Sequence, residues 1–194
     1  VHDPVLSRVT QRQVGRHVES FSSALRSALR EAPDVLVVGE MRDSETIQLA
    51  LSAAETGVLV FGTLHTNTAA RAVDRILDTL SEDIRDHARG VLSVLLRAAI
   101  DQRLLKRSTG DGRVAAIEVL VGSTALAHMI REGKTHQIEG ALQSANDLQG
   151  NLGFDNCLYR LARERLVTPE EAIAFARVPD ALTRRLAELP RDDE

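Results

Sequence analysis

The sequence has little of what several common kinds of protein require. Its single cysteine, Cys157, excludes an internal disulfide bond and any zinc cluster built from cysteines. No apolar segment is long enough to span a bilayer, and no signal-peptide pattern opens the chain. The formal net charge is -4, and because no basic tract offsets it, nonspecific nucleic-acid binding is disfavoured. We therefore expect a cytoplasmic protein that binds no nucleic acid and does not insert into a membrane.

Three catalytic motifs are also absent from the 194 residues. The chain has no G-x-x-x-x-G-K-[ST] loop to cradle phosphates, no H-x-x-x-H pair for catalytic zinc and no G-x-S-x-G elbow for a serine hydrolase. The composition, 43% hydrophobic and 27% charged, is that of a globular protein. Because the sequence opens on Val1 rather than methionine, we expect it to be a piece of a longer protein.

The stretch that organises the chain is residues 34–43, D-V-L-V-V-G-E-M-R-D. The unbroken apolar run Val35–Val38 predicts a strand buried on both faces, as in parallel sheets between helices. Glu40, Arg42 and Asp43 follow at its carboxyl end, where open α/β sheets bind ligands. A carboxylate there can reach a metal ion or orient a water beside a phosphate. The alternative is that Glu40 only caps the strand and faces water.

A second apolar run, Val58–Phe61, leads into His65 and Thr66. If both strands lie in one parallel sheet, His65 and Thr66 face the same crevice as Glu40. An acid beside a His-Thr pair suits a hydrolytic phosphate site, where catalysis is mostly positioning and charge stabilisation. His65 also precedes a predicted helix, whose N-terminus attracts anions, although a lone histidine is more often structural.

Apolar stripes and capping residues predict helices around these strands. The predicted helix starts are Ser20, then Asp43 or Ser44, then Thr66, Asn67 or Thr68. A long helix is predicted from Ser81 to about Leu105, and a third strand over Val114–Val121. Beyond Gly122 the pattern is helical, with no further strand. We predict an α/β protein with a core in residues 1–121 and a small helical domain in residues 122–194.

Residues Phe21–Asp78 closely resemble the twitching-motility ATPases of type IV pili, the PilT family of the secretion-ATPase superfamily. The resemblance runs from about Gln11 to Arg177. It rests on a Walker B stretch followed by M-R-D and on a histidine box, H-T-N-T-A. Ala125–Glu132, A-L-A-H-M-I-R-E, is also similar to the family's A-I-R-N-L-I-R-E helix, which is associated with pilus retraction. The resemblance implies a RecA-like P-loop NTPase core with a mostly parallel sheet.

The resemblance also implies ATP and Mg²⁺ as cofactors and a homo-hexamer. The ring would act on an inner-membrane pilus platform protein, as a cytoplasmic assembly peripheral to that membrane. The implied catalytic residues are Glu40, His65 and Asp3. Glu40 would be the Walker B acid, close to the attacking water and to Mg²⁺, which it would contact indirectly. His65 would sense or contact the γ-phosphate, and Asp3 would belong to the acidic box. The implied nucleotide-binding residues are Arg42, Thr66 and Arg75. Arg8, Arg12 and Arg16 are candidates to contact a phosphate or a neighbouring subunit.

The chain departs from the family pattern at several positions. His2 and Leu6 replace acids of the acidic box, Gln13 replaces a glutamate and Ala32 replaces an acid before Pro33. We expect the Walker A loop and an N-terminal domain upstream of Val1. Two alternatives therefore stand beside a retraction ATPase: a non-hydrolysing regulatory or scaffold subunit, and a pilus-extension or type II secretion ATPase. Pilus-extension and type II secretion ATPases often carry a four-cysteine zinc insertion. The single cysteine of this chain therefore favours a retraction ATPase.

Overall fold

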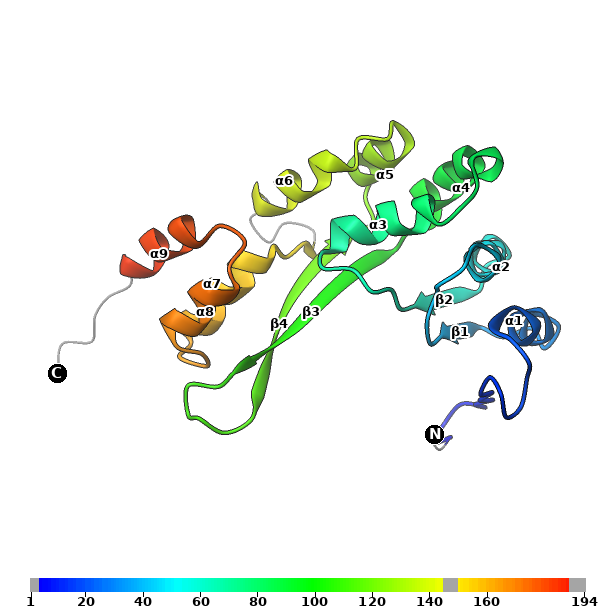
Figure 1. The fold of residues 1–194 in the computed structure, drawn as a ribbon, viewed down its shortest axis with the longest axis horizontal. Coiled ribbons are helices and arrows are strands. Elements are labelled where there is room, and N and C mark those ends of the chain that lie inside the picture. The colour runs from blue at the N-terminus through cyan, green and yellow to red at the C-terminus, as the bar shows by residue number, and fades with distance from the viewer. Residues whose placement is uncertain (1–3, 145–149, 189–194) are drawn as a thin grey trace. The chain divides into compact units, whose positions relative to one another are not determined.

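A parallel pair of strands forms the sheet of the first of two units in the computed structural model, which describes residues 4–144 and 150–188 (Figure 1). The first unit is Val1–His65 with Ile76–Leu95, and the second is Thr66–Arg75 with Leu96–Glu194. Strands β1 (Val35–Val38) and β2 (Leu59–Gly62) pair in parallel, with Val38 opposite Gly62. Helix α2 (Ser44–Glu55) connects them. The first two predicted strands and the helix between them are therefore confirmed.

Local sequence explains where the helices of this unit begin and end. Helix α1 (Phe21–Leu29) starts after Ser20, whose hydroxyl accepts a hydrogen bond from the Ser23 amide at 3.1 Å, in a capping box. Helix α2 ends at Glu55 with Thr56 as its C-cap, and Gly57 follows with a positive φ of 96°. Helix α4 (Glu82–Leu95) completes the unit. Its core consists of Leu25, Val38, Ile47, Ala50, Ala53, Ile76, Leu77, Leu80, Ala88 and Leu92.

The prediction that the first strand is buried on both faces is wrong for this chain. Val38 is 3% exposed, but Val35 and Val37 are 50% and 72% exposed. On β2, Leu59 and Phe61 are 45% and 56% exposed. Because alternate side chains of a strand point to opposite faces, one face of the pair is covered and the other is open.

An antiparallel hairpin forms the sheet of the second unit, with β3 (Ala98–Lys106) paired to β4 (Arg113–Val121) over their whole length. Helix α3 (Ala69–Asp78) begins in this unit. The remaining helices are α5 (Thr124–Arg131), α6 (His136–Ser144), α7 (Phe154–Arg163), α8 (Pro169–Phe175) and α9 (Pro179–Ala187). In Figure 1, α7 and α8 lie along the hairpin. Buried side chains of the hairpin, of α7, α8 and α9 and of the segments between them form one core: Leu105, Ala116, Leu152, Phe154, Cys157, Leu158, Leu161, Ala162, Val167, Ala172 and Leu182.

The predicted long helix from Ser81 to Leu105 is wrong, because α4 ends at Leu95 and β3 follows. The third predicted strand is confirmed as β4, but its partner is β3 and the pairing is antiparallel. The helical region after Gly122 is confirmed for the described residues, with one isolated β-bridge between Val119 and Leu152. The predicted domain boundary between residues 121 and 122 stays a prediction. Within the described residues, no helix combines the length and the apolar content needed to cross a bilayer.

Candidate functional site

The carboxyl ends of β1 and β2 remain hydrogen-bonded to each other beyond the strands themselves. The Thr63 amide donates to the Val38 carbonyl at 3.4 Å, and the Met41 amide donates to the Thr63 carbonyl at 3.0 Å. These bonds hold the two loops side by side. As a result, the loop after β1 brings Glu40 next to His65 from the loop after β2.

Glu40 lies at the centre of a small charged group. Its Oε1 atom is 2.8 Å from Nε2 of His65 and also forms an ion pair with Nε of Arg42. The Glu40 side chain is 18% exposed, whereas those of His65 and Arg42 are 83% and 72% exposed. The carboxylate is thus the partly buried member, and the two nitrogen-bearing side chains are open to a ligand. The predicted proximity of Glu40 and His65 is present in the structure.

The electrostatics of this group keep Glu40 ionised. The hydrogen bond and charge of the Arg42 guanidinium lower the pKa of Glu40 below its ordinary value of 4.5, with a smaller contribution from His65 and against the opposing effect of desolvation. Reciprocally, the Glu40 carboxylate raises the pKa of Arg42. An ionised carboxylate accepts hydrogen bonds and donates none. Glu40 is therefore suited to orient a water molecule rather than to supply a proton.

Asp43, the third polar residue after β1, has a structural role. Its Oδ1 accepts a hydrogen bond from the Thr46 amide and its Oδ2 one from the Thr46 hydroxyl, both at 2.8 Å, so it is the N-cap of α2. The backbone hydrogen bond from Thr46 is the main cause that lowers the pKa of Asp43. This cap sets the direction in which the chain leaves the loop that carries Glu40.

The remaining predicted site residues include Thr66, Arg75, Asp3 and Arg12. The Thr66 hydroxyl donates to the Thr68 carbonyl at 3.4 Å, and Arg75 is an exposed residue of α3. Asp3 lies outside the described residues. Arg12 forms an ion pair with Glu31, so this arginine is engaged within the chain. The roles of Thr66, Arg75 and Asp3 stay predictions.

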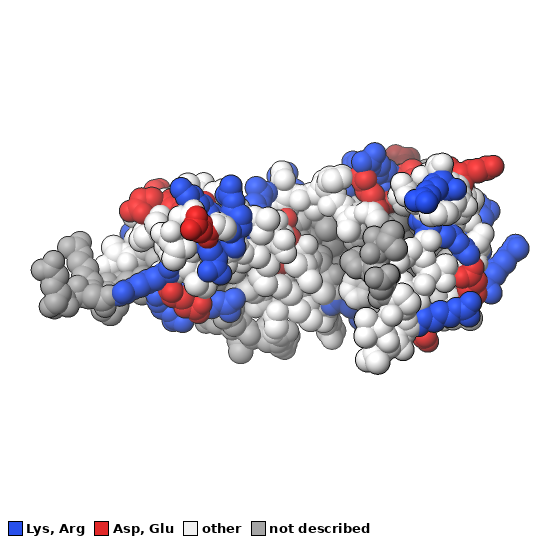
Figure 2. Space-filling model, turned by 90° about the horizontal axis from the view of Figure 1, so that it is seen from below, with Lys and Arg blue, Asp and Glu red and all other residues white. Residues whose placement is uncertain are grey.

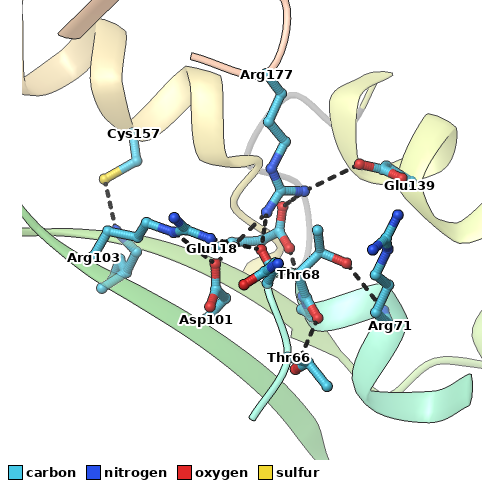
Figure 3. Close-up of polar contacts among 12 residues, drawn as sticks. Thr66, Thr68, Arg71, Asp101, Arg103, Glu118, Glu139, Cys157 and Arg177 are labelled. Atoms are coloured by element: carbon cyan, nitrogen blue, oxygen red, sulfur yellow. Dashed lines mark hydrogen bonds and ion pairs between the residues drawn. The ribbon is translucent and has the colours of Figure 1, made fainter. Parts of the chain in front are cut away.

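The sequence reasoning missed a buried acid in the second unit, Glu118 on β4 (Figure 3). Glu118 is 1% exposed, and its Oε1 accepts a hydrogen bond from the Ala69 amide at 2.7 Å. Its Oε2 lies 2.6 Å from Nη1 of Arg177. The N-terminus of α3, expected to attract an anion, thus already binds an anion of the protein itself. A signal was available, because Glu118 is the one charged residue in the apolar strand 114–121.

Two further properties bear on possible ligands, namely the grouping of metal-binding side chains and the distribution of surface charge. Within the described residues, no group of three or more His, Cys, Asp or Glu side chains could hold a metal ion. On the face that Figure 2 shows, basic and acidic side chains are intermixed and do not form one basic surface.

Comparison with known proteins finds a family model and close relatives that match most of this chain. The sequence profile of a family described as "Type II/IV secretion system protein" matches residues 1–167. The type IV pilus retractation ATPase PilT of Pseudomonas aeruginosa is 47% identical over 180 residues, which cover 93% of this chain and 52% of that protein. A twitching motility protein of Neisseria gonorrhoeae is 49% identical over 172 residues, covering 89% of this chain and 46% of that protein.

A solved structure of similar fold is the crystal structure of the pilus retraction motor PilT with bound ADP. It matches with a TM-score of 0.79 and 46% identity, over 90% of this chain and 49% of that one. The chain thus spans about half the length of these relatives. The resemblance predicted from the two motifs is confirmed, and so is the predicted α/β secretion-ATPase fold.

Proposed function

Because the chain belongs to the Type II/IV secretion system protein family, we propose that it is part of a hexameric motor ATPase that couples ATP hydrolysis to type IV pilus retraction. The observation that carries this proposal is the 2.8 Å approach of Glu40 Oε1 and His65 Nε2 at neighbouring strand ends. In this proposal residues 1–121 belong to the ATPase core, and residues 122–194 form a helical domain.

Each residue of the group then has a distinct role. Glu40, held ionised, accepts a hydrogen bond from the attacking water and orients it toward the γ-phosphate. His65, largely exposed, turns from Glu40 toward the γ-phosphate and thereby senses the nucleotide. Arg42 neutralises Glu40 in the absence of a phosphate and can pair with the phosphate when it is bound. Thr66 and Arg75 are assigned to nucleotide binding, and Asp3 to the acidic box.

The cofactors follow from the same chemistry. The relative whose structure contains ADP supports a nucleotide as ligand. Magnesium usually keeps several waters and is bound through one or two carboxylates together with the phosphates. The donor set here fits that mode, because Glu40 is ionised and can act through a bound water. The metal would supply charge neutralisation at the phosphates.

The proposed partners are five further copies of the full-length protein and a platform protein of the inner membrane. The ring would work in the cytoplasm, peripheral to that membrane. A type II secretion or pilus-extension ATPase would use the same group of residues. In the source bacterium, loss of the gene should abolish twitching and leave pili on the surface, whereas loss of the pili themselves would indicate an extension motor.

The central experiment is Glu40→Gln in the full-length protein. The amide keeps the size of the side chain but loses the charge that orients water, so we expect turnover to fall by at least about 100-fold while nucleotide binding is retained. The matched control is Glu45→Gln, because Glu45 also pairs with an arginine, Arg26, but on the exposed surface of α2.

Steady-state hydrolysis and equilibrium binding of a labelled nucleotide measure the two effects. Unchanged turnover in Glu40→Gln would contradict the assignment of Glu40. Full-length wild-type protein that binds ATP without hydrolysing it would instead indicate the regulatory subunit.

A further inference from the structure

The first residue of helix α3, Ala69, is hydrogen-bonded to Glu118, which forms a buried ion pair with Arg177. Neither Glu118 nor Arg177 belongs to the Walker B stretch or the histidine box. We propose that Glu118 and Arg177 are positioning residues that hold the histidine-box segment, residues 65–69, in place for hydrolysis. This inference rests on the function proposed above. It assigns no direct contact with the nucleotide to either residue.

The two oxygens of Glu118 have separate partners. Oε1 accepts the hydrogen bond from the Ala69 amide at 2.7 Å, and Oε2 lies 2.6 Å from Nη1 of Arg177. A carboxylate that is only 1% exposed is costly to bury unless it is paired and hydrogen-bonded, and both conditions are met here. Glu118 therefore joins the first residue of α3 to Arg177.

The backbone at Arg177 is anchored independently. Arg177 lies between α8 and α9, and its amide donates to Oδ1 of Asp155 at 2.8 Å. The next amide, that of Val178, donates to Oδ2 of Asp155 at 2.9 Å. Because Asp155 lies in the first turn of α7, the loop that carries Arg177 is fixed to that helix.

The guanidinium of Arg177 reaches several elements at once (Figure 3). Besides Glu118, it lies 3.4 Å from Oε1 of Glu139 on α6 and 3.7 Å from Oδ2 of Asp101 on β3. Its Nη2 also donates to the carbonyl of Asn67 at 3.5 Å. We call these residues, Asp101, Glu118, Glu139 and Arg177, the Arg177 cluster. Three carboxylates around one guanidinium keep the cation in place.

The cluster therefore contacts the histidine-box segment at two backbone groups, the Asn67 carbonyl and the Ala69 amide. Asn67 accepts a second, long hydrogen bond from Nη2 of Arg103 at 3.5 Å. With both groups held, the short stretch that follows His65 has little freedom. Displacement of a reacting group by about 1 Å can reduce a rate by about 100-fold, so this restraint matters for hydrolysis.

A purely structural role is the competing explanation. In that case the cluster would only attach the C-terminal helices to the hairpin, and its loss would lower the melting temperature without changing kcat. A positioning role predicts a different result: kcat falls while KM for ATP is nearly unchanged, and amide exchange increases within residues 66–72.

The experiment uses Arg177→Met in the full-length protein, measured below its melting temperature. We expect kcat to fall about tenfold or more, KM to change less than about threefold, and exchange at the start of α3 to rise about tenfold, because Arg177→Met removes the charged partner of Glu118 and the hydrogen bond to the Asn67 carbonyl.

The control is Arg185→Met. The guanidinium of Arg177 lies over the ring of Phe154, 5.2 Å from its centroid. That of Arg185 lies in the same way over Tyr159, at 4.0 Å, and donates a hydrogen bond to Asn156, and both of these partners lie on α7.

Two further variants keep the test decisive. Arg177→Lys retains the charge and should restore part of kcat. Glu118→Gln keeps an acceptor for the Ala69 amide but loses the ion pair, so it should lower kcat while raising exchange less than Arg177→Met does. Wild-type kcat and wild-type exchange in a folded Arg177→Met or Glu118→Gln protein would overturn the inference. Absence of hydrolysis in the wild type would refute the proposed function instead, and the exchange data alone would then decide whether the cluster holds the segment.

Discussion

Two glutamates of this chain show how the surroundings of a residue determine its use. Glu40 is partly buried and is paired with two exposed side chains, Arg42 and His65, which can move toward a ligand. Glu118 is fully enclosed and its two oxygens already have partners. In the proposed function the first arrangement changes when a phosphate binds, whereas the second cannot change without breaking a buried ion pair. Glu40 is therefore suited to chemistry and Glu118 to positioning.

At this scale the N-cap Asp43 allows a test of both stability and pH dependence. Asp43→Ala should reduce the free energy of unfolding by about 1 kcal/mol, because two hydrogen bonds at the start of α2 are lost. Asp43→Asn should retain most of the stability, since its amide oxygen can still accept from Thr46. The folded-state pKa of Asp43 is lowered below its ordinary value of 3.8. The stability due to the ionised carboxylate is thus complete above that value and is lost as the pH falls through the lower folded-state pKa.

Urea unfolding at neutral and at acidic pH measures this effect. The difference between wild type and Asp43→Asn should shrink as the pH is lowered. A difference of the same size at both pH values would show that the charge of Asp43 contributes nothing to the cap.

At the scale of elements, the chain between Ser81 and Leu105 shows where local pattern fails. Its first part is helix α4, as predicted, but residues 98–106 form β3. In β3 Ile100 and Leu104 lie on the open face, whereas Leu105 is completely buried, so apolar residues occupy both faces. Such a pattern does not distinguish a strand from the continuation of a helix. Residues 98–106 form a strand because they pair with β4 over nine residues, and such tertiary contacts override a weak local helix propensity.

The connection between strand β4 and helix α5 requires a glycine at position 122. The Gly122 amide donates to the Arg97 carbonyl at 2.8 Å, and a Cβ at Gly122 would lie 2.3 Å from the carbonyl oxygen of Leu96. Because backbone must move to relieve that contact, Gly122→Ala should cost about 1–3 kcal/mol of unfolding free energy.

Gly90→Ala is the matched control for Gly122→Ala. Gly90 lies inside α4, and a Cβ added there would have no other atom within 4 Å apart from its own helix, so alanine should be neutral or stabilising by up to about 1 kcal/mol. Chemical denaturation of both variants measures the difference. Equal stability of the two would contradict the close approach at Gly122.

At the scale of the whole molecule, each unit has its own buried core. Ile47 on α2 is 1% exposed and belongs to the first unit, whereas Leu158 on α7 is completely buried in the core of the second. The first unit also carries the open face of β1 and β2, where Val37 and Phe61 are more than half exposed. Such a face adds little to the stability of its own unit, because its apolar area remains in water.

We therefore expect the two units to respond separately to mutation. Ile47→Ala and Leu158→Ala should each cost about 2–5 kcal/mol, mainly through loss of buried contacts. Hydrogen exchange followed by mass spectrometry should show lost protection in α2 for the first variant and in α7 for the second. Equal loss of protection in both helices, for either variant, would show that the chain unfolds as one unit.

Features of this protein that depend on neighbouring residues could be predicted from the amino-acid sequence. The helix caps Ser20 and Asp43 and the strands β1, β2 and β4 were predicted correctly, because each depends on residues within a few positions of the chain. The motif residues Glu40 and His65 were also identified from local sequence, and their roles stay predictions. The family, too, followed from short motifs at fixed spacing.

The contacts between distant segments became known from the three-dimensional fold. It replaced the C-terminal part of a predicted helix with β3, left one face of β1 and β2 open, and brought Arg177 and Glu118 to the start of α3. Nothing in the sequence near Ala69 predicts its partner on β4, since they are 49 positions apart. Contacts between residues so far apart in the sequence form only when the helices and strands pack together. The free energy of burying their surfaces, rather than local sequence, determines which residues meet.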